Sequence, residues 1–148
     1  MIIRQRRNDN RLHRMIIALR RMVAEDIMPA NILKEKADAF GDRIIACCRV
    51  MQERGVPKSL GGQLFRAGTS VGANIAEAQF AQGKKDFISK LEISLKEINE
   101  TEYWLERLYK GQFLSDWEFK SMRSDCIAIR RLLIASVTTV KKKLNQEK

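Results

Sequence analysis

Residues 115–144, SDWEFKSMRSDCIAIRRLLIASVTTVKKKL, decide the fold class because they specify one long amphipathic helix. Ser115 followed three residues later by Glu118 has the spacing of a capping box, which marks a helix start. Apolar or small side chains then recur at steps of three and four, the period of an α-helix. The predicted buried seam is Phe119, Met122, Cys126, Ile129, Leu133, Ser136, Val140 and Leu144. Ile127 and Ile134 lie off this seam and are candidates for contact outside the subunit.

Three more helices are predicted upstream by the same period and by turn residues. They span roughly residues 31–54, 57–82 and 84–110, and Gly111 follows the last as a typical C′ residue. Because every connection is short, consecutive helices should be antiparallel neighbours. The sequence therefore predicts an all-α fold, an antiparallel up-down-up-down four-helix bundle with a basic N-terminal extension.

The second predicted helix is apolar on two sides. One stripe is Leu60, Leu64, Ala67, Val71, Ile75 and Ala78, and the other is Phe65, Thr69, Gly72, Ala76 and Phe80. Such a helix is expected to be buried between neighbours. Its glycines, Gly61, Gly62, Gly68 and Gly72, each cost about 1 kcal/mol against alanine in a helix interior. We interpret them as sites of close helix approach; a loop is the alternative, although the apolar period continues through them.

The positive charge is concentrated at the two ends of the chain. Residues 1–28 hold seven basic and three acidic groups, residues 29–118 hold thirteen of each, and residues 119–148 hold eight basic and two acidic groups. We therefore divide the chain into a basic amphipathic extension, 1–28, and a bundle domain, 29–148. Met28 is also a candidate translation start. A neutral body with basic ends is typical of a polyanion-binding protein. The alternative is that the positive charge serves only solubility.

Composition excludes several classes of protein. The chain is 45% hydrophobic and 31% charged, which suits a globular helical domain and excludes collagen-like and disordered classes. No apolar run approaches the roughly 18 residues of a membrane span, and the N-terminus does not match a signal peptide. We expect a cytoplasmic protein. Its cysteines, Cys47, Cys48 and Cys126, form no CxxC pair and are predicted to be structural thiols.

No catalytic or metal-binding pattern is found. His13 is the single histidine and lies among arginines, so neither a Ser-His-Asp nor a Cys-His arrangement is plausible. Ligand clusters with metal-binding spacing and a phosphate-binding glycine loop are missing as well. The sequence predicts no catalytic residues, no metal and no cofactor, and hence a non-enzymatic protein.

One polar pattern repeats on the second and third helices. Ser70, Asn74 and Glu77 share one face of the second helix, and Ser94, Glu97 and Thr101 likewise share one face of the third. We interpret them as a structural polar motif, a buried hydrogen-bonded seam that fixes register. An acid/base pair of Glu77 and Glu97 is the alternative.

The candidate nucleic-acid-binding residues are the cations of the two basic ends. They are Arg4, Arg6, Arg7, Arg11, Arg14, Arg20, Arg21, Arg123, Arg130, Arg131, Lys141, Lys142 and Lys143. Lysines at a helix C-terminus also stabilise the helix through its dipole, so a structural role is the alternative for Lys141, Lys142 and Lys143. Because aromatic residues do not interleave with these cations, phosphate-led binding with weak sequence preference is expected.

The stretch 63–78, QLFRAGTSVGANIAEA, with 85–97, KDFISKLEISLKE, and 103–105, YWL, resembles a known family. It is similar to the four-helix-bundle proteins encoded by intervening sequences of bacterial 23S rRNA genes, which are related to the accessory variability determinants of diversity-generating retroelements. The resemblance covers roughly residues 31–145, and Ser70, Asn74, Glu77, Ser94 and Glu97 match its motif. It implies a homopentameric ring without established enzymatic activity. For the retroelement relatives it also implies binding to a reverse transcriptase and to nucleic acid.

Two functions from different classes follow. The first is a homo-oligomeric scaffold that binds RNA or DNA by charge, with a reverse transcriptase as a candidate partner. The second is a ring whose ligand is another protein. A membrane-surface role for the basic extension is a weaker third hypothesis, and no membrane partner is expected for the bundle.

Overall fold

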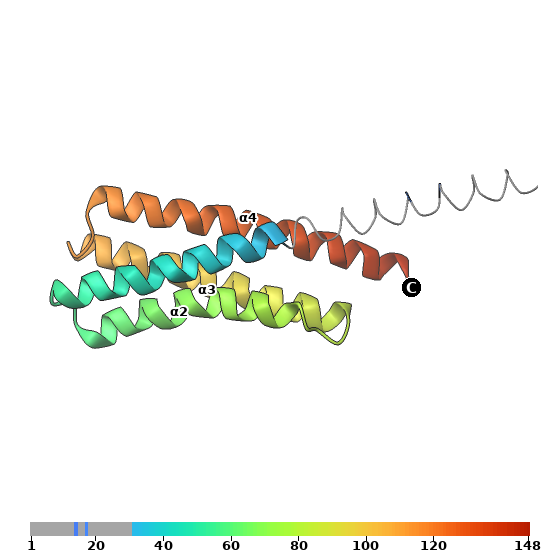
Figure 1. The fold of residues 1–148 in the computed structure, drawn as a ribbon, viewed down its shortest axis with the longest axis horizontal. Helices are drawn as coiled ribbons and strands as arrows, with labels where there is room; N and C mark the ends of the chain where they lie inside the picture. Colours follow the sequence, from blue (N-terminus) through green and yellow to red (C-terminus); the bar gives the residue numbers. More distant parts are fainter. Residues whose placement is uncertain (1–13, 15–16, 18–30) are drawn as a thin grey trace, which may run out of the picture. The chain divides into compact units, whose positions relative to one another are not determined.

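Four helical segments run back and forth along residues 31–148 of the computed structural model (Figure 1). Residues 31–53 are helical, followed by α2 (Lys58–Ala78), α3 (Lys84–Lys110) and α4 (Asp116–Gln146). The structure describes residues 31–148 together with Arg14 and Ile17. Of these, Leu33–Lys148 form one compact unit by their contacts. The described chain is all-α, and consecutive helices are antiparallel, as predicted.

Most of the basic extension lies outside the described residues. Arg4, Arg6, Arg7, Arg11, Arg20 and Arg21 lie outside the described residues, and so does the predicted boundary between residues 28 and 29. Arg14 is described as helical and exposed. The division into an extension and a bundle domain therefore stays a prediction.

The helix limits agree with the sequence except after α2. The predicted second helix continued to residue 82, whereas α2 ends at Ala78. Beyond it, the amides of Phe80 and Ala81 donate to the carbonyls of Glu77 and Ala78, three residues back, so the chain tightens into a turn. Gly83 then precedes α3, and Asp86 accepts a hydrogen bond from the Gln82 amide at 3.2 Å.

The core is one cluster to which all four helices contribute. Its largest fully buried side chains are Phe40, Ile44, Met51, Leu64, Leu91, Ile98, Leu105, Leu108, Ile129 and Leu133. The seam predicted for α4 is confirmed through Leu133, but Val137 rather than Ser136 is the next buried residue. A strict seven-residue seam drifts by about 20° per heptad around a straight helix, so the buried position moves by one residue.

Two of the four glycines in α2 permit close helix approach. A Cβ on Gly68 would lie 2.7 Å from the Ile44 side chain, and one on Gly72 would lie 3.4 Å from the Ala37 carbonyl oxygen. The prediction is confirmed at these positions. It is wrong for Gly61 and Gly62, since a Cβ on Gly61 would meet only Val56, at 4.0 Å, and one on Gly62 nothing within 4 Å.

The second apolar stripe of α2 is only partly buried, contrary to the prediction: Thr69, Gly72 and Ala76 are half-buried, whereas its two phenylalanines are exposed. Phe65 is 46% exposed and Phe80 is 86% exposed. The bundle closes by packing only one side of α2 on the 31–53 helix and α3, so the other side faces outward. The periodic spacing of apolar residues shows that one side of a helix is apolar, but it does not show which surface, if any, covers that side.

Candidate nucleic-acid interface

Two of the three arginines of α4, Arg123 and Arg130, are held by α3. Arg123 Nε donates to Glu102 Oε1 at 2.9 Å, and Arg130 Nε donates to Asn99 Oδ1 at 2.8 Å and also pairs with Glu102. Partial burial opposes ionisation of Glu102, but hydrogen bonds from the two arginines outweigh it and hold its pKa below the usual value. These predicted binding residues therefore also join α3 to α4.

The lysines at the end of α4 are held more loosely. Lys141 Nζ lies 2.5 Å from Glu92 Oε1, yet the two side chains are 52% and 49% exposed. Lys142 and Arg131 are exposed and form no ion pair within the described part of the chain. Exposed ion pairs contribute only about 0–1 kcal/mol, so an incoming phosphate can replace such carboxylates at low cost.

The structure adds two lysines that the sequence analysis missed. Lys84 at the start of α3 pairs with Glu147 at the end of α4, which brings Lys84 and Lys85 to the same end of the bundle as the last lysines of α4. In Figure 1, the start of α3 and the end of α4 lie at that same end. We call this surface the basic pole: Lys84, Lys85, Lys141, Lys142 and Lys143.

The position of Lys84 and Lys85 is unfavourable for the helix itself. Both lie in the first turn of α3, where the helix dipole favours anions by about 0.3–1 kcal/mol. Gly83 precedes them and offers no capping side chain. Two cations in an uncapped first turn are a signal visible in the sequence, although Asp86 lies in the same turn and Lys84 pairs with Glu147.

The polar motif is only partly buried. The Ser94 hydroxyl is fully buried and donates to the Val71 carbonyl oxygen at 2.8 Å, which joins α3 to α2. Ser70 donates to Arg66 and Asn74 to Ser70, both to carbonyls of their own helix. Within this subunit the buried part of the motif is therefore Ser94 and Thr101, and Thr101 donates to the Glu97 carbonyl of its own helix at 2.7 Å.

The two carboxylates of the motif do not form a pair. Glu77 lies 2.7 Å from Lys90 Nζ, and Glu97 lies 3.4 Å from Arg66 Nη1. Arg66 also bonds Glu100, and with a Trp104 hydrogen bond it lowers the pKa of that carboxyl. Each carboxylate is thus neutralised by a cation of another helix, which gives no support to an acid/base pair.

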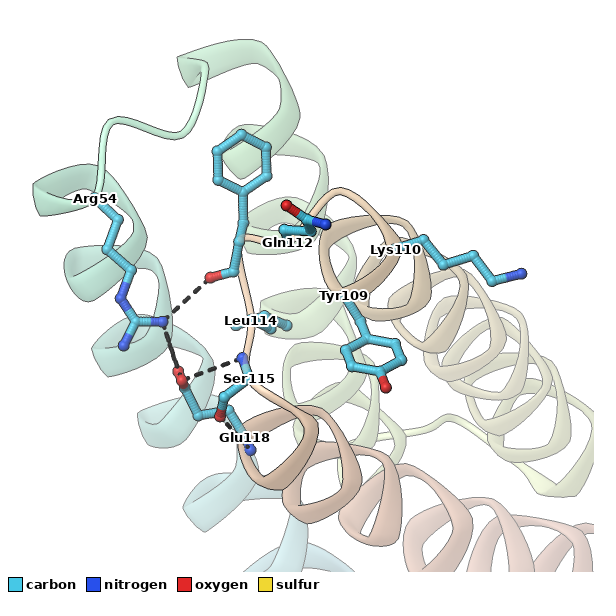
Figure 2. Close-up of a pocket in the computed structure, with 8 residues that line it drawn as sticks. Arg54, Tyr109, Lys110, Gln112, Leu114, Ser115 and Glu118 are labelled. Atoms are coloured by element: carbon cyan, nitrogen blue, oxygen red, sulfur yellow. Dashed lines mark hydrogen bonds and ion pairs between the residues drawn. The ribbon is translucent and has the colours of Figure 1, made fainter.

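The opposite end of the bundle contains a shallow hollow beside the turn between α3 and α4 (Figure 2). Arg54 reaches into it and donates to the Phe113 carbonyl at 3.1 Å and to Glu118 at 2.8 Å. Glu118 also completes the predicted capping box with Ser115. Hydrogen bonding from Arg54 lowers the pKa of Glu118, and partial burial opposes this. We call this the closed end.

The cysteines behave as structural residues. Cys126 is fully buried, and burial raises its pKa to about 12; the same cause raises the pKa of Cys48 to about 11. Their thiols therefore stay protonated and weakly nucleophilic. In the described residues no group of His, Cys, Asp and Glu is placed to hold a metal ion. Nor is any helix among them long and apolar enough to cross a membrane.

Comparison with known proteins identifies the family. The model of the 23S rRNA-intervening sequence protein family matches residues 30–135. The chain belongs to this family. A crystal structure of a protein with unknown function from the S23 ribosomal protein family of Bacteroides thetaiotaomicron is 40% identical, with a TM-score of 0.73. The match covers 75% of this chain and 99% of that one. No curated protein sequence matches.

The predicted site residues lie partly inside and partly outside the range that the family model matches. The polar motif and the arginines held by Glu102 lie inside residues 30–135, whereas Lys141, Lys142 and Lys143 lie beyond them. The basic pole therefore combines the start of α3, inside the matched range, with a C-terminal run outside it. The family assignment confirms the resemblance seen in the sequence.

Proposed function

We propose that this protein is a non-enzymatic, self-associating scaffold that binds the phosphate backbone of RNA or DNA through its basic pole. The observation that supports it most is the pair of lysines in the first turn of α3, placed against the helix dipole and beside the lysine run of α4. A surface that gathers like charges at the cost of helix stability is typical of an anion-binding site.

The chemistry of the pole favours backbone contacts. Lysine is a flexible point charge that contacts phosphate without the planar, bidentate geometry by which arginine reads guanine. The opposing carboxylates, Glu92 and Glu147, are exposed, so their desolvation costs little when phosphate replaces them. We therefore expect weak sequence preference and a strong dependence on salt.

The test is binding of a labelled structured RNA and a DNA duplex, followed by fluorescence anisotropy between roughly 50 and 200 mM salt. With about five phosphate contacts the affinity should fall by a few hundredfold over this range. Replacing Lys84 and Lys85 by glutamine should reduce the slope of log affinity against log salt by about 2. No binding at low salt would contradict the proposal.

Lys96→Gln and Lys58→Gln together make a matched control for that variant. Both lysines are exposed, lie on α3 and α2 away from the pole, and form no ion pair within the described chain. The control should retain the wild-type salt slope. An equal loss in both variants would show that net charge, rather than the pole, drives binding.

A second candidate function is an interaction scaffold for another protein, favoured by the exposed outer side of α2. A pull-down with the wild-type chain, at a salt concentration that abolishes nucleic-acid binding, separates it from the first. The pentameric count and the reverse transcriptase partner, both implied by the resemblance, stay predictions.

A further inference from the structure

The side of the subunit where α2 meets the 31–53 helix exposes two large apolar residues, Phe65 at 46% and Ile45 at 44%. Ile45 lies one turn before Cys48, whose thiol faces the Gly61 carbonyl of α2 at 3.9 Å. Phe65 lies one turn after Gly61, on the same side. A Cβ on Gly62 would meet nothing within 4 Å, so no described residue of the subunit uses the room beside it. We call this surface the knob side: Phe65, Ile45 and Gly62.

The other side of the 31–53 helix, where α4 packs, contains a hollow of about 320 Å³. Met51 and Met122 belong to its buried floor. Its rim carries the exposed residues Ala46, Val50 and Trp117, and Trp117 is 74% exposed. An exposed tryptophan beside an apolar hollow is typical of an interaction surface. We call this surface the hollow side.

The knob and the hollow lie at the same distance from the closed end. The turns over residues 54–57 and 111–115 both lie at that end of the bundle (Figure 1). At 1.5 Å per residue, Phe65 lies about 11 Å from the start of α2, Ala46 about 11 Å from the end of the 31–53 helix, and Met122 about 9 Å from the start of α4. A rotation about an axis parallel to the helices keeps these distances, so it can bring Phe65 of one copy to the hollow of the next.

The two sides are also placed for a closed ring. The 31–53 helix packs on α2 and on α4, and α3 packs on the same two helices, so the knob side and the hollow side are neighbouring faces roughly 90° apart. A ring of four copies needs its two contact surfaces about 90° apart and a ring of five about 108°. Contacts on opposite faces would give an open filament instead.

Charges farther from the closed end agree with the same contact. Asp38 lies seven residues before Ile45, on the knob side, where it pairs with Lys34. Lys36 lies seven residues before Arg43, which reaches α4 on the hollow side. Along the helix axis Asp38 and Lys36 are about 3 Å apart. The same rotation therefore brings the carboxylate of one copy near the ammonium group of the next.

We infer that Phe65 of one copy inserts into the hollow beside Trp117 of the next, and that copies repeat this contact around an axis parallel to the helices. Two different surfaces meet, so the contact is heterologous and a ring can close. The inference rests on the self-association in the proposed function and names the two surfaces that carry it. Because the axis is parallel to the helices, the basic poles of all copies lie on one rim of the ring.

Two variants and their mixture test the contact. Phe65→Glu removes the knob and Ala46→Glu fills the hollow, and each alone should raise the dissociation constant by at least about tenfold, because the contact would bury an unpaired charge. Each variant keeps the surface that the other lacks. An equimolar mixture should therefore form a dimer of one copy of each and grow no further. Sedimentation equilibrium measures the masses, and Ile93→Glu on α3, at a residue 39% exposed, is the matched control that should keep the wild-type mass.

The dimer in the mixture also shows that both variants fold. A mixture that stays monomeric while the wild type assembles would overturn the contact, and so would a mixture that regains the full wild-type mass. Wild-type mass in either variant alone would overturn it as well and leave self-association intact. A wild type that is monomeric at every concentration would overturn both the contact and self-association.

A third variant leaves the fold untouched. Trp117→Ala changes a side chain that is 74% exposed in the subunit, so it should keep the melting temperature while weakening association by at least about tenfold. Unchanged association would overturn the placement of Trp117 at the contact.

RNA binding tests the shared rim separately. Phe65→Glu keeps every lysine of the basic pole, so its RNA affinity should fall by at least about tenfold only through the loss of multivalent binding. Equal RNA affinity in the variant and the wild type would overturn the shared rim, whereas the masses decide the contact and the salt slope decides the basic pole.

Discussion

The two ends of the bundle use pairs of a cation and a carboxylate in opposite ways. At the closed end, Arg54 donates hydrogen bonds to Glu118 and to a backbone carbonyl, and Glu118 also completes the capping box of α4. At the basic pole, lysines lie in a helix start that disfavours them, opposed by exposed carboxylates. Charges that bond each other, the backbone and a helix cap stabilise a fold, whereas charges gathered against their helix remain available to a ligand.

The largest effect on stability is expected at the closed end. Glu118→Ala removes the reciprocal hydrogen bond of the capping box and the partner of Arg54. We expect a loss of about 1–2 kcal/mol in the free energy of unfolding, with RNA affinity unchanged. Urea denaturation measures it. Glu147→Ala at the basic pole is the matched control and should change the free energy by less than about 0.5 kcal/mol.

Acid titration sharpens the comparison. The folded pKa of Glu118 is lowered, so its contribution is present above the unfolded pKa and is lost as the pH falls through the folded value. Arg54→Gln removes the main cause of the lowered pKa. The decrease of unfolding free energy between about pH 7 and pH 3 should therefore be shallower in this variant. Parallel curves for the two proteins would show that Arg54 does not act through Glu118.

A smaller effect is expected from releasing a lysine of the basic pole. Glu92→Gln removes the carboxylate that faces Lys141. We expect RNA affinity to rise by about two- to threefold and stability to change by less than about 0.5 kcal/mol, because the pair is exposed. Anisotropy and urea denaturation on the same samples give both numbers. Unchanged or weaker binding would show that Lys141 does not contact the ligand.

A variant of the α3 start tests the conflict with the helix dipole. Lys85→Glu puts a favourable charge in the first turn of α3 and should stabilise the protein by about 0.3–1 kcal/mol. The same change should weaken RNA binding. Thermal melting at low and high salt measures the gain, which should shrink as salt screens the dipole. A loss of stability would mean that Lys85 has a structural partner.

Much of the fold could be read from local sequence. The capping box and the helical period each depend on neighbours within a few residues, and so the helix types and most limits were predicted. The end of α2 was placed four residues late, because the apolar period continues through Phe80 while the backbone already turns. The buried seam of α4 was predicted as far as Leu133. Beyond it the buried position moves by one residue, because packing between helices sets the supercoiling.

The candidate site was predicted less completely. The lysines of α4 are visible as a run in the sequence, but Lys84 and Lys85 join them only because antiparallel helices return to the same end. Arg123 and Arg130 share Glu102, which lies on another helix and gives no local signal. Pairings between residues far apart in the chain depend on helix rotation and register, which composition does not encode.

The sequence by itself determined the all-α class, the four helices, the family and the basic character of the C-terminal run. Periodicity, caps and charge counts are local properties, and a single chain displays them without being folded. Only the tertiary structure decided which glycines bring helices together, which cations are held and which side of α2 is left open. These outcomes depend on how whole helix faces meet, because burial in a bundle is shared among helices that are distant in sequence.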